Sequence, residues 1–231
     1  MKDIYYRVVG NGYPLLFLHG NGENMSIFNT LVDELKDEYQ CICIDSRYHG
    51  KSIKSGDMSY SQMCKDVLNV IEELELTEYD VIGFSDGAIV SILLSLEDQR
   101  LKHMVLMGAN CRVQGLKFIC RLNDWLTLFC LIPFCLYNKK MRIKWKQIKM
   151  METMKDITKE ELNRIIIPTL VMAGEYDLIK EKETHYISEN IKYSVERIIE
   201  NGTHFLLRDE FKKTFKEIDM FLKVCHHKES V

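Results

Sequence analysis

Short apolar runs alternate with segments of helical periodicity along most of the chain. The helical segments repeat apolar residues every three or four positions, for example at Met63, Val67 and Val70. Regular alternation of strand and helix predicts an α/β domain with a mostly parallel, doubly wound sheet. The short runs are typical of β-strands and lie at Ile4–Val9, Leu15–Leu18, Cys41–Ile44, Val81–Phe84, Met104–Met107, Pro168–Ala173 and Val195–Ile199.

The alternation breaks after Cys111, where strand signals stop and only helical patterns follow. Pro133 should kink or end an apolar helix in this stretch. Alternation resumes at Pro168. We therefore predict one α/β core with a helical cap inserted into it; the core is formed by residues 1–110 and 165–231, and the cap by residues 111–164.

One junction between a predicted strand and a predicted helix has the pattern Gly-x-Ser-x-Gly, with Gly83 and Gly87 on either side of Ser85. A strand that turns into a helix within about one residue strains the central residue and leaves little room for side chains two positions away. Such a turn presents the Ser85 hydroxyl at the sheet edge, near a helix N-terminus. The alternative is a turn that merely uses glycines, but the surrounding residues favour a nucleophile.

A serine hydroxyl needs a base to take its proton and a third group to orient that base. Ligands of an open α/β sheet gather at the carboxyl ends of the strands, so both groups should follow later strands. Asp177 and His204 occupy such positions, in the order Ser, Asp, His. Glu175 is the alternative acid, although it lies only two residues past its strand. His19 is the alternative base, and we expect it to brace its loop instead. We expect His103 in a polar loop or on a helix surface, and His226 in a frayed tail.

Acyl transfer also needs hydrogen-bond donors for the oxyanion. We predict that the backbone amide of Asp86, just after the nucleophile, is one donor. The other should come from the loop after an early strand, His19–Gly22, and we expect it to be the amide of Asn21. A carboxylate beside an oxyanion would hinder catalysis, so the Asp86 side chain should point away and bond elsewhere.

With these motifs in order, the chain resembles the α/β-hydrolase superfamily from end to end. The resemblance implies a sheet of about eight mostly parallel strands, with a helical cap inserted after strand six. It also implies a serine hydrolase, most often a carboxylesterase, without naming the substrate. The residues that carry it are His19-Gly20, Asp45-x-Arg47-x-x-Gly50-x-Ser52, the turn at Ser85, Gly174-x-x-Asp177 and Gly202-x-His204.

Composition narrows the class of protein further. The 231 residues carry a net charge of −3, which gives no argument for nucleic-acid binding. The eight cysteines mostly lie in apolar runs and include no C-x-x-C pair, and the first residues lack the apolar core of a signal peptide. We therefore expect reduced, buried thiols and a cytoplasmic protein. We expect no metal or cofactor, because metal-ligand spacing is lacking and Gly50-Lys51-Ser52 does not complete a phosphate loop.

The predicted cap combines aromatic and basic residues. Trp125, Phe129 and Phe134 either line a pocket for an acyl or aromatic group or bury the cap against the core. The segment Lys139–Lys149 holds six cations and no acid. It is either a solvated helix face or a site of weak contact with an anionic membrane surface.

Together these features predict a monomeric or homodimeric serine hydrolase that cleaves a small or medium carboxylic ester through an acyl-enzyme. A lysophospholipid or thioester hydrolase is the alternative enzyme. The alternative outside enzymes is a slow or inactive protein that binds a small molecule on the same fold. The acyl preference stays open.

Overall fold

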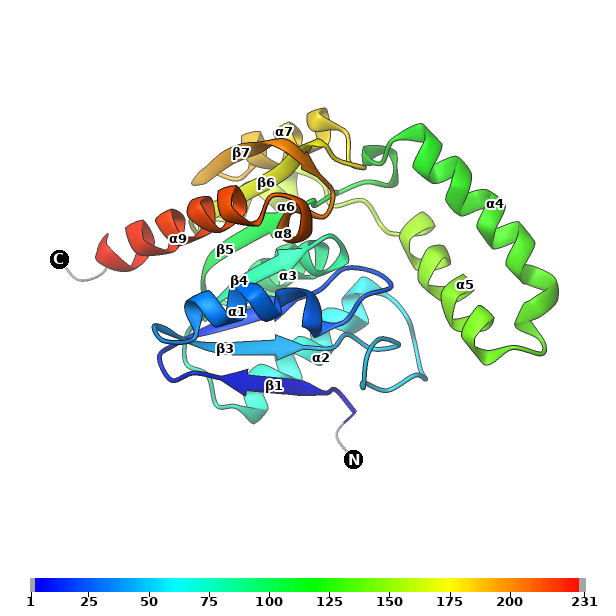
Figure 1. The fold of residues 1–231 in the computed structure, drawn as a ribbon, viewed down its shortest axis with the longest axis horizontal. Coiled ribbons are helices and arrows are strands. Elements are labelled where there is room, and N and C mark those ends of the chain that lie inside the picture. Colours follow the sequence, from blue (N-terminus) through cyan, green and yellow to red (C-terminus); the bar gives the residue numbers. More distant parts are fainter. Residues whose placement is uncertain (1–2, 229–231) are drawn as a thin grey trace.

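The computed structural model describes residues 3–228 and contains one sheet with helices on both faces (Figure 1). Within these residues the sheet has seven strands, in the order β1-β3-β2-β4-β5-β6-β7. Only β1 runs antiparallel to its neighbour, and all other pairs are parallel. The strands are β1 (Tyr6–Val9), β2 (Tyr13–Leu18), β3 (Tyr39–Ile44), β4 (Tyr79–Phe84), β5 (Leu101–Met107), β6 (Thr169–Tyr176) and β7 (Ser194–Thr203).

The helices cover both faces of the sheet, because each face carries its own apolar cluster. One cluster packs under α2, α3, α6 and α7, and the other under η1, α1, α8 and α9. These helices are η1 (Met25–Phe28), α1 (Asn29–Leu35), α2 (Tyr60–Glu73), α3 (Asp86–Glu97), α6 (Lys159–Asn163), α7 (Glu181–Asn190), α8 (Leu206–Asp209) and α9 (Phe211–Lys228).

Burial on both faces explains the sequence of the central strands. The strand residues Leu15–Leu18 and Val81–Phe84 are buried throughout, so these runs are continuously apolar and do not alternate. Because parallel strands end at the same edge, the loops after β2, β4, β5, β6 and β7 meet there. The candidate site lies at that edge.

The cap is a helical hairpin that projects from the sheet edge (Figure 1). After the short helix η2 (Val113–Gly115) come α4 (Phe118–Cys135) and α5 (Lys139–Glu152), which pack on each other. Asn138 is the N-cap residue of α5, and its side chain accepts hydrogen bonds from the amides of Lys140 and Met141. Thr158 and Glu161 form a capping box at the N-terminus of α6.

Three details differ from the sequence expectations. The sheet has seven strands in the described chain where the resemblance implied about eight, so the cap follows the fifth strand rather than the sixth. Pro133 lies inside the last turn of α4, which continues to Cys135; with no N–H, the proline leaves the carbonyl of Phe129 without its usual intrahelical donor. Five cysteines are buried as expected, but the three on α4, Cys120, Cys130 and Cys135, are not.

Candidate active site

Ser85 occupies the sharp turn between β4 and α3. Its backbone has φ 53° and ψ −115°, which is a strained region for a residue with a side chain. A Cβ on Gly83 would lie 2.5 Å from the carbonyl oxygen of Gly87, and one on Gly87 would lie 2.0 Å from that of Leu18. Backbone atoms therefore exclude side chains at both positions, which is the steric reason predicted for the Gly-x-Ser-x-Gly spacing.

The structure brings together three distant side chains that the sequence singled out. His204 follows β7, and its Nε2 lies 3.0 Å from Ser85 Oγ. Asp177 follows β6, and its Oδ1 lies 2.7 Å from His204 Nδ1. With Asp177 ionised, Nδ1 carries the proton and donates to the carboxylate. Nε2 is then left to accept the proton of the Ser85 hydroxyl.

Asp177 is held as an anion by its surroundings. Burial alone would raise the pKa of its carboxyl, but the hydrogen bond with His204 and two backbone amides hold that pKa below its usual value. The amides belong to Ile179, which donates to Oδ1, and Gly174, which donates to Oδ2. The alternative acid, Glu175, is exposed and accepts a hydrogen bond from the amide of Asn201.

The imidazole of His204 fits because the neighbouring strand ends in a glycine. Gly108 follows β5 with φ +60°. A Cβ at this position would lie 2.7 Å from Cε1 and 2.8 Å from Nδ1 of His204. The sequence shows only that Gly108 follows a predicted strand. The structure shows why a glycine is needed there, because a side chain would overlap the imidazole of His204.

The loop after β2 brings Asn21 to the same place. Gly20, Asn21, Ser85 and Asp86 line one cavity. The Asn21 side chain donates to the carbonyl oxygen of Gln147 in α5, at 3.2 Å. Since that side chain is engaged with the cap, the backbone amides of Asn21 and Asp86 stay the expected oxyanion donors.

His19 braces this loop, as predicted. Its Nδ1 donates to the carbonyl oxygen of Gly20 at 2.8 Å, and its Nε2 accepts from the amide of Ser46 at 3.0 Å. Burial lowers the pKa of the imidazole to about 4, so the ring is neutral and can accept at one nitrogen while donating at the other.

His49 is a second neutral, buried imidazole, and it links the loop to the cap. Its Nδ1 donates to the carbonyl oxygen of Arg47, so its Nε2 is the acceptor. That nitrogen accepts from the amide of Gly22 at 3.0 Å and from Gln147 Nε2 at 2.9 Å. Gln147 therefore holds the loop after β2 in two ways, directly through its carbonyl oxygen to Asn21 and indirectly through its side chain to His49, which accepts from Gly22.

The Asp86 side chain has a partner outside the proposed oxyanion site, as expected. The Tyr60 hydroxyl donates to its Oδ1 at 2.8 Å, while the buried Oδ2 has no hydrogen-bond partner among the described residues. Burial raises the pKa of this carboxyl to about 6, against the opposite effect of the Tyr60 bond. The group is therefore neutral in mild acid and charged above about pH 6.

A cavity of about 930 Å³ lies over Ser85, between the sheet edge and the cap. Its volume is within the range of small-molecule sites, about 300–1,000 Å³. The cap side of the cavity is mainly apolar and is formed by Leu116, Ile119, Leu122, Leu126, Ile148 and Met151.

The three aromatic cap residues named from the sequence do not line this cavity. Trp125, Phe129 and Phe134 are 67%, 71% and 58% exposed. The cavity follows α4 only as far as Thr127, so Phe129 and Phe134 lie beyond it. Trp125 precedes Leu126 and points to another side of the helix, because successive residues are about 100° apart. These residues thus lie outside the cavity over Ser85 and are not buried against the core, so the structure supports neither of the two roles expected from the sequence.

Two further cavity residues escaped the sequence analysis. Tyr60 reaches the cavity from α2, and nothing in its helical spacing distinguishes it from a core residue. Glu23 lies two residues after Asn21, and its buried Oε2 has no partner within the described chain. Burial raises the pKa of the Glu23 carboxyl. The sequence signal that could have identified Glu23 is an acidic residue in the loop that follows β2.

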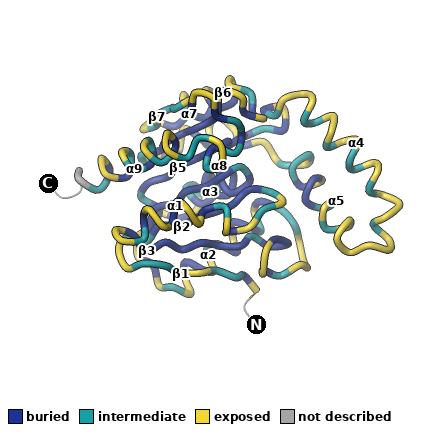
Figure 2. The backbone as a smooth tube through the Cα atoms, in the orientation of Figure 1, coloured by how far each residue is buried: buried dark blue, intermediate teal, exposed yellow. Residues whose placement is uncertain are grey.

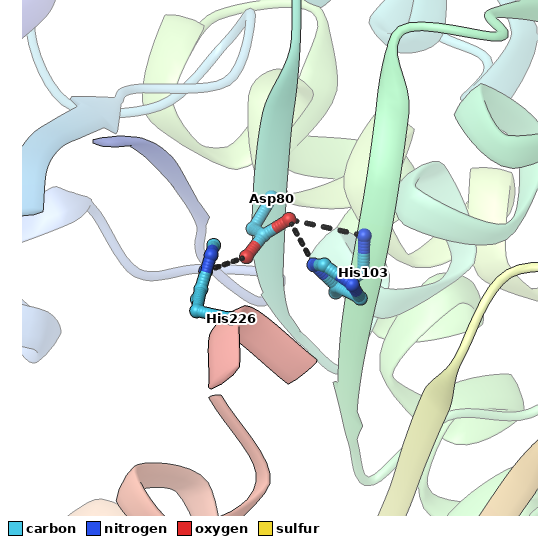
Figure 3. A group of neighbouring side chains, drawn as sticks. All are labelled: Asp80, His103 and His226. Atoms are coloured by element: carbon cyan, nitrogen blue, oxygen red, sulfur yellow. Dashed lines mark hydrogen bonds and ion pairs between the residues drawn. The ribbon is translucent and has the colours of Figure 1, made fainter. Parts of the chain in front are cut away.

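At the opposite end of the sheet, Asp80, His103 and His226 form a second cluster of titratable groups (Figure 3). Asp80 Oδ1 lies 2.8 Å from His103 Nδ1, and its Oδ2 lies 2.9 Å from His226 Nε2. The sequence placed His103 in a loop or on a helix surface and His226 in a frayed tail. Both placements are wrong, because His103 lies inside β5 and His226 in α9.

The ligand-type atoms of this cluster lie within 4.8 Å of one another, an arrangement that sequence spacing could not reveal. Hydrogen bonds from both imidazoles to one carboxylate account for the geometry without an ion. Burial alone would lower the pKa of His103, but the hydrogen bond with Asp80 raises it to about 10. His103 is therefore a buried cation paired with an anion.

The sequence profile of the α/β hydrolase fold family matches residues 13–128, from β2 through the turn at Ser85 and into α4. The chain is an α/β-hydrolase. Its likeness to individual curated proteins is partial. It is 33% identical over 101 residues to a serine hydrolase-like protein of Danio rerio, which covers 42% of this chain and 31% of the relative.

Two further relatives match part of this α/β-hydrolase at similar levels. A pimeloyl-[acyl-carrier protein] methyl ester esterase of Yersinia enterocolitica is 26% identical over 48% of this chain and 42% of its own length. An sn-1-specific diacylglycerol lipase, ABHD11, of Xenopus laevis is 32% identical over 39% of this chain and 30% of its own length. The chain thus spans less than half the length of each curated relative that it matches here.

Solved structures match the α/β-hydrolase over nearly all of its length. An esterase from Exiguobacterium antarcticum has a TM-score of 0.80 at 21% identity and covers 95% of both chains. A lipase-esterase related protein from Clostridium acetobutylicum also has a TM-score of 0.80, at 23% identity, and covers 95% of this chain and 100% of its own. At these identities the likeness shows the fold.

Proposed function

We propose that this α/β-hydrolase is a serine hydrolase that cleaves a small or medium carboxylic ester. The observation that carries the proposal is the hydrogen-bonded series Ser85–His204–Asp177, with distances of 3.0 Å and 2.7 Å. These are the lengths that proton transfer between a nucleophile and its base requires. The esterase and lipase names of the relatives support the same class of reaction.

In the proposed reaction, Ser85 Oγ attacks the ester carbonyl carbon while His204 Nε2 takes the hydroxyl proton. The negative charge that develops on the carbonyl oxygen is stabilised by the backbone amides of Asn21 and Asp86. The C–O bond to the alcohol then breaks, and His204 returns the proton to the leaving oxygen. Water repeats the sequence on the acyl-enzyme, with Asp177 stabilising the imidazolium each time.

Covalent labelling by a fluorophosphonate tests the nucleophile directly. The wild type should be labelled at Ser85, and Ser85→Ala should not. The matched control is Ser61→Ala, which removes an exposed hydroxyl from α2 and should leave labelling intact. Failure of the wild type to react would contradict the proposal and favour a protein that binds a small molecule without turnover.

A panel of p-nitrophenyl esters of rising chain length, run beside a thioester and a lactone, tests the substrate class. The apolar cap wall of the cavity supports an acyl group of at least medium length. The exposed apolar surface of α4 favours a second candidate activity, hydrolysis of a lysophospholipid or thioester, because such substrates reside in or near lipid surfaces. Preferred cleavage of the thioester or of a lysophospholipid would select that candidate.

A further inference from the structure

The outer half of the cap hairpin is apolar and uncovered. None of the 18 residues of α4 is buried, and its main packing partner is α5 (Figure 2). We call the following exposed residues, with the first cations of α5, the cap tip: Trp125, Phe129, Ile132, Phe134, Leu136, Tyr137, Lys139, Lys140 and Arg142.

Neither the substrate cavity nor the core explains this surface. The cavity follows α4 only to Thr127, and the most exposed apolar side chains of the hairpin lie at its turn, with 78% of Leu136 and 91% of Tyr137 exposed. Soluble monomers rarely expose a contiguous apolar patch of more than a few hundred Å², and larger patches mark interaction sites. The cap tip therefore needs a partner surface.

The charges beside this apolar surface select the kind of partner. Between Trp125 and Met151 the sequence holds six cations and no acid. Because the whole chain carries −3 and this segment +6, the remainder of the molecule carries −9. An anionic surface would therefore attract the cap tip and repel the rest of the protein, which fixes one orientation.

A second copy of the chain fits less well, because it would bring the same six cations to a shared interface. A lipid bilayer also suits the residue types. Trp and Tyr concentrate at the boundary between headgroups and acyl chains, and lysine and arginine beside them reach the phosphates. Trp125 and Tyr137 lie at the two ends of the apolar stretch, and Lys139 follows directly.

The helix α4 is the one helix of the described chain that is long and apolar enough to cross a membrane by length and composition. A crossing is nevertheless unfavourable. Arg121 and Asp124 lie within its 18 residues, and the basic helix α5 leads the chain back. An apolar helix joined to a basic one is typical of a hairpin that lies in the plane of the interface.

We propose that the cap tip docks on an anionic lipid bilayer, with its apolar residues among the upper acyl chains and Lys139, Lys140 and Arg142 on the phosphates. In this orientation Ile119, Leu122 and Leu126 of the same helix form the cavity wall next to the bilayer. A lipid ester with a single acyl chain can then pass along α4 to Ser85. This choice of substrate rests on the proposed function, whereas the docking does not.

The protein carries its own probe for this docking, because its two tryptophans, Trp125 and Trp145, both lie in the cap hairpin. Trp145→Phe leaves Trp125 as the only tryptophan. Vesicles of phosphatidylcholine with phosphatidylglycerol should shift its emission to the blue, and lipids brominated on the acyl chain should quench it. Pure phosphatidylcholine vesicles should do so at least about tenfold more weakly, since the cations lose their partner. Unchanged emission with the anionic vesicles would overturn the proposal.

Two matched pairs of variants, measured by vesicle co-sedimentation, separate charge from apolar contact. Replacement of the three cap-tip cations, Lys139→Gln, Lys140→Gln and Arg142→Gln, should weaken binding about a hundredfold, because each cation contributes roughly fivefold. The control is a variant in which three exposed lysines of the core, Lys65, Lys212 and Lys216, are replaced by glutamine, and it should have little effect on binding.

The second pair tests apolar contact. The cap-tip variant is Phe129→Gln with Leu136→Gln, and its control is Ile166→Gln with Val224→Gln, at two exposed positions of the core. The cap-tip pair should lose about tenfold or more per residue, and the core pair should bind like the wild type. Equal binding by both pairs would overturn the proposal. A dimer in solution that Phe129→Gln with Leu136→Gln converts to a monomer, without any vesicle binding, would assign the surface to a second copy instead.

Hydrolysis measurements keep the two proposals apart. If both hold, the cap-tip variants should cleave a soluble p-nitrophenyl ester at the wild-type rate but lose most activity on a lysophospholipid presented in anionic vesicles. Vesicle binding without hydrolysis of any ester would leave the docking intact and contradict the proposed function. Hydrolysis of an ester without vesicle binding would support the proposed function and overturn the docking.

Discussion

Two carboxylate–histidine pairs lie at opposite ends of the same sheet, and they differ in the groups that surround them. In the pair Asp177–His204, the second ring nitrogen faces the hydroxyl of Ser85 beside a cavity. In the pair Asp80–His103, the carboxylate also accepts from the backbone amide of His103 and from a second imidazole, His226. The chemical groups are alike, but their surroundings are not.

The surroundings decide which pair can move a proton. At Asp80, three donors surround one carboxylate, and the hydrogen bond raises the pKa of His103 to about 10 despite burial. An imidazole that stays protonated at neutral pH cannot act as a base. At Asp177, two backbone amides share the carboxylate with His204, and the other ring nitrogen stays available to a hydroxyl. Pairing with a carboxylate is therefore not by itself a sign of catalysis.

The largest effect should come from exchanging one carboxylate for an amide in each pair. Asp177→Asn should lower kcat about 10⁴-fold with little loss of stability, because the amide favours the wrong tautomer of His204. Asp80→Asn should keep kcat within about twofold but cost about 3–5 kcal/mol of unfolding free energy, since it removes the negative charge that balances a buried cation. Steady-state kinetics and urea unfolding of both variants check this, and similar kinetic losses in both would end the distinction.

A smaller loss of activity should follow when the space for one imidazole is filled. Gly108→Ala places a methyl group against His204, and also introduces a side chain at φ +60°. A displacement of about 1 Å should cost about 10²-fold in kcat. Gly56→Ala is the matched control, because φ is also positive there and a Cβ meets only Arg47 Nη1 at 3.3 Å, and it should be far milder. Equal losses would mean that backbone strain, not contact with His204, is responsible.

The dependence of stability on pH should separate the pairs in a third way. Because the pKa of folded His103 is raised from 6.5 to about 10, its ion pair stabilises the fold fully below about pH 6.5. That stability is lost as the pH rises through about 10. Thermal unfolding should therefore show a falling midpoint between pH 7 and pH 10 that His103→Gln largely removes, along with about 2–4 kcal/mol of stability at pH 7. A parallel fall in the variant would contradict this assignment.

The smallest effect concerns a third carboxyl, Asp86, which is buried without an imidazole partner. Its pKa of about 6 lies above its usual 3.8, so its negative charge destabilises both the fold and a neighbouring oxyanion above pH 6. Asp86→Asn should raise kcat about two- to fivefold at pH 8 and leave it unchanged at pH 5. A pH–rate profile of the two proteins checks this, and identical profiles would show that the charge does not reach the reacting atoms.

The strand ends and the order of the three site residues could be predicted because both follow from local patterns. Gly83 and Gly87 are dictated by a single turn, and Asp177 and His204 follow strands whose ends must meet in a parallel sheet. The role of Gly108 could not be predicted, because it depends on an imidazole 96 residues away in the sequence. His226 was misjudged for the same reason, since its partner Asp80 lies 146 residues away in the sequence.

The cap was the least predictable region. Periodicity correctly indicated helices, but it could not tell which face of α4 would meet the cavity, because both faces are apolar. Phe129 and Leu126 are equally good core residues by composition, and only the position of the helix over the sheet separates them. The cytoplasmic location, the oligomeric state and the absence of cofactors stay predictions.

Gln147 connects the cap to the loops at the candidate active site. Its carbonyl oxygen accepts a hydrogen bond from Asn21 and its side chain bonds to His49, so the hairpin is tied to the loop that carries the proposed oxyanion donor. In the proposed docked state, a tilt of the hairpin against the bilayer would therefore shift that donor. Docking of the cap tip and turnover at Ser85 would then be coupled through Gln147.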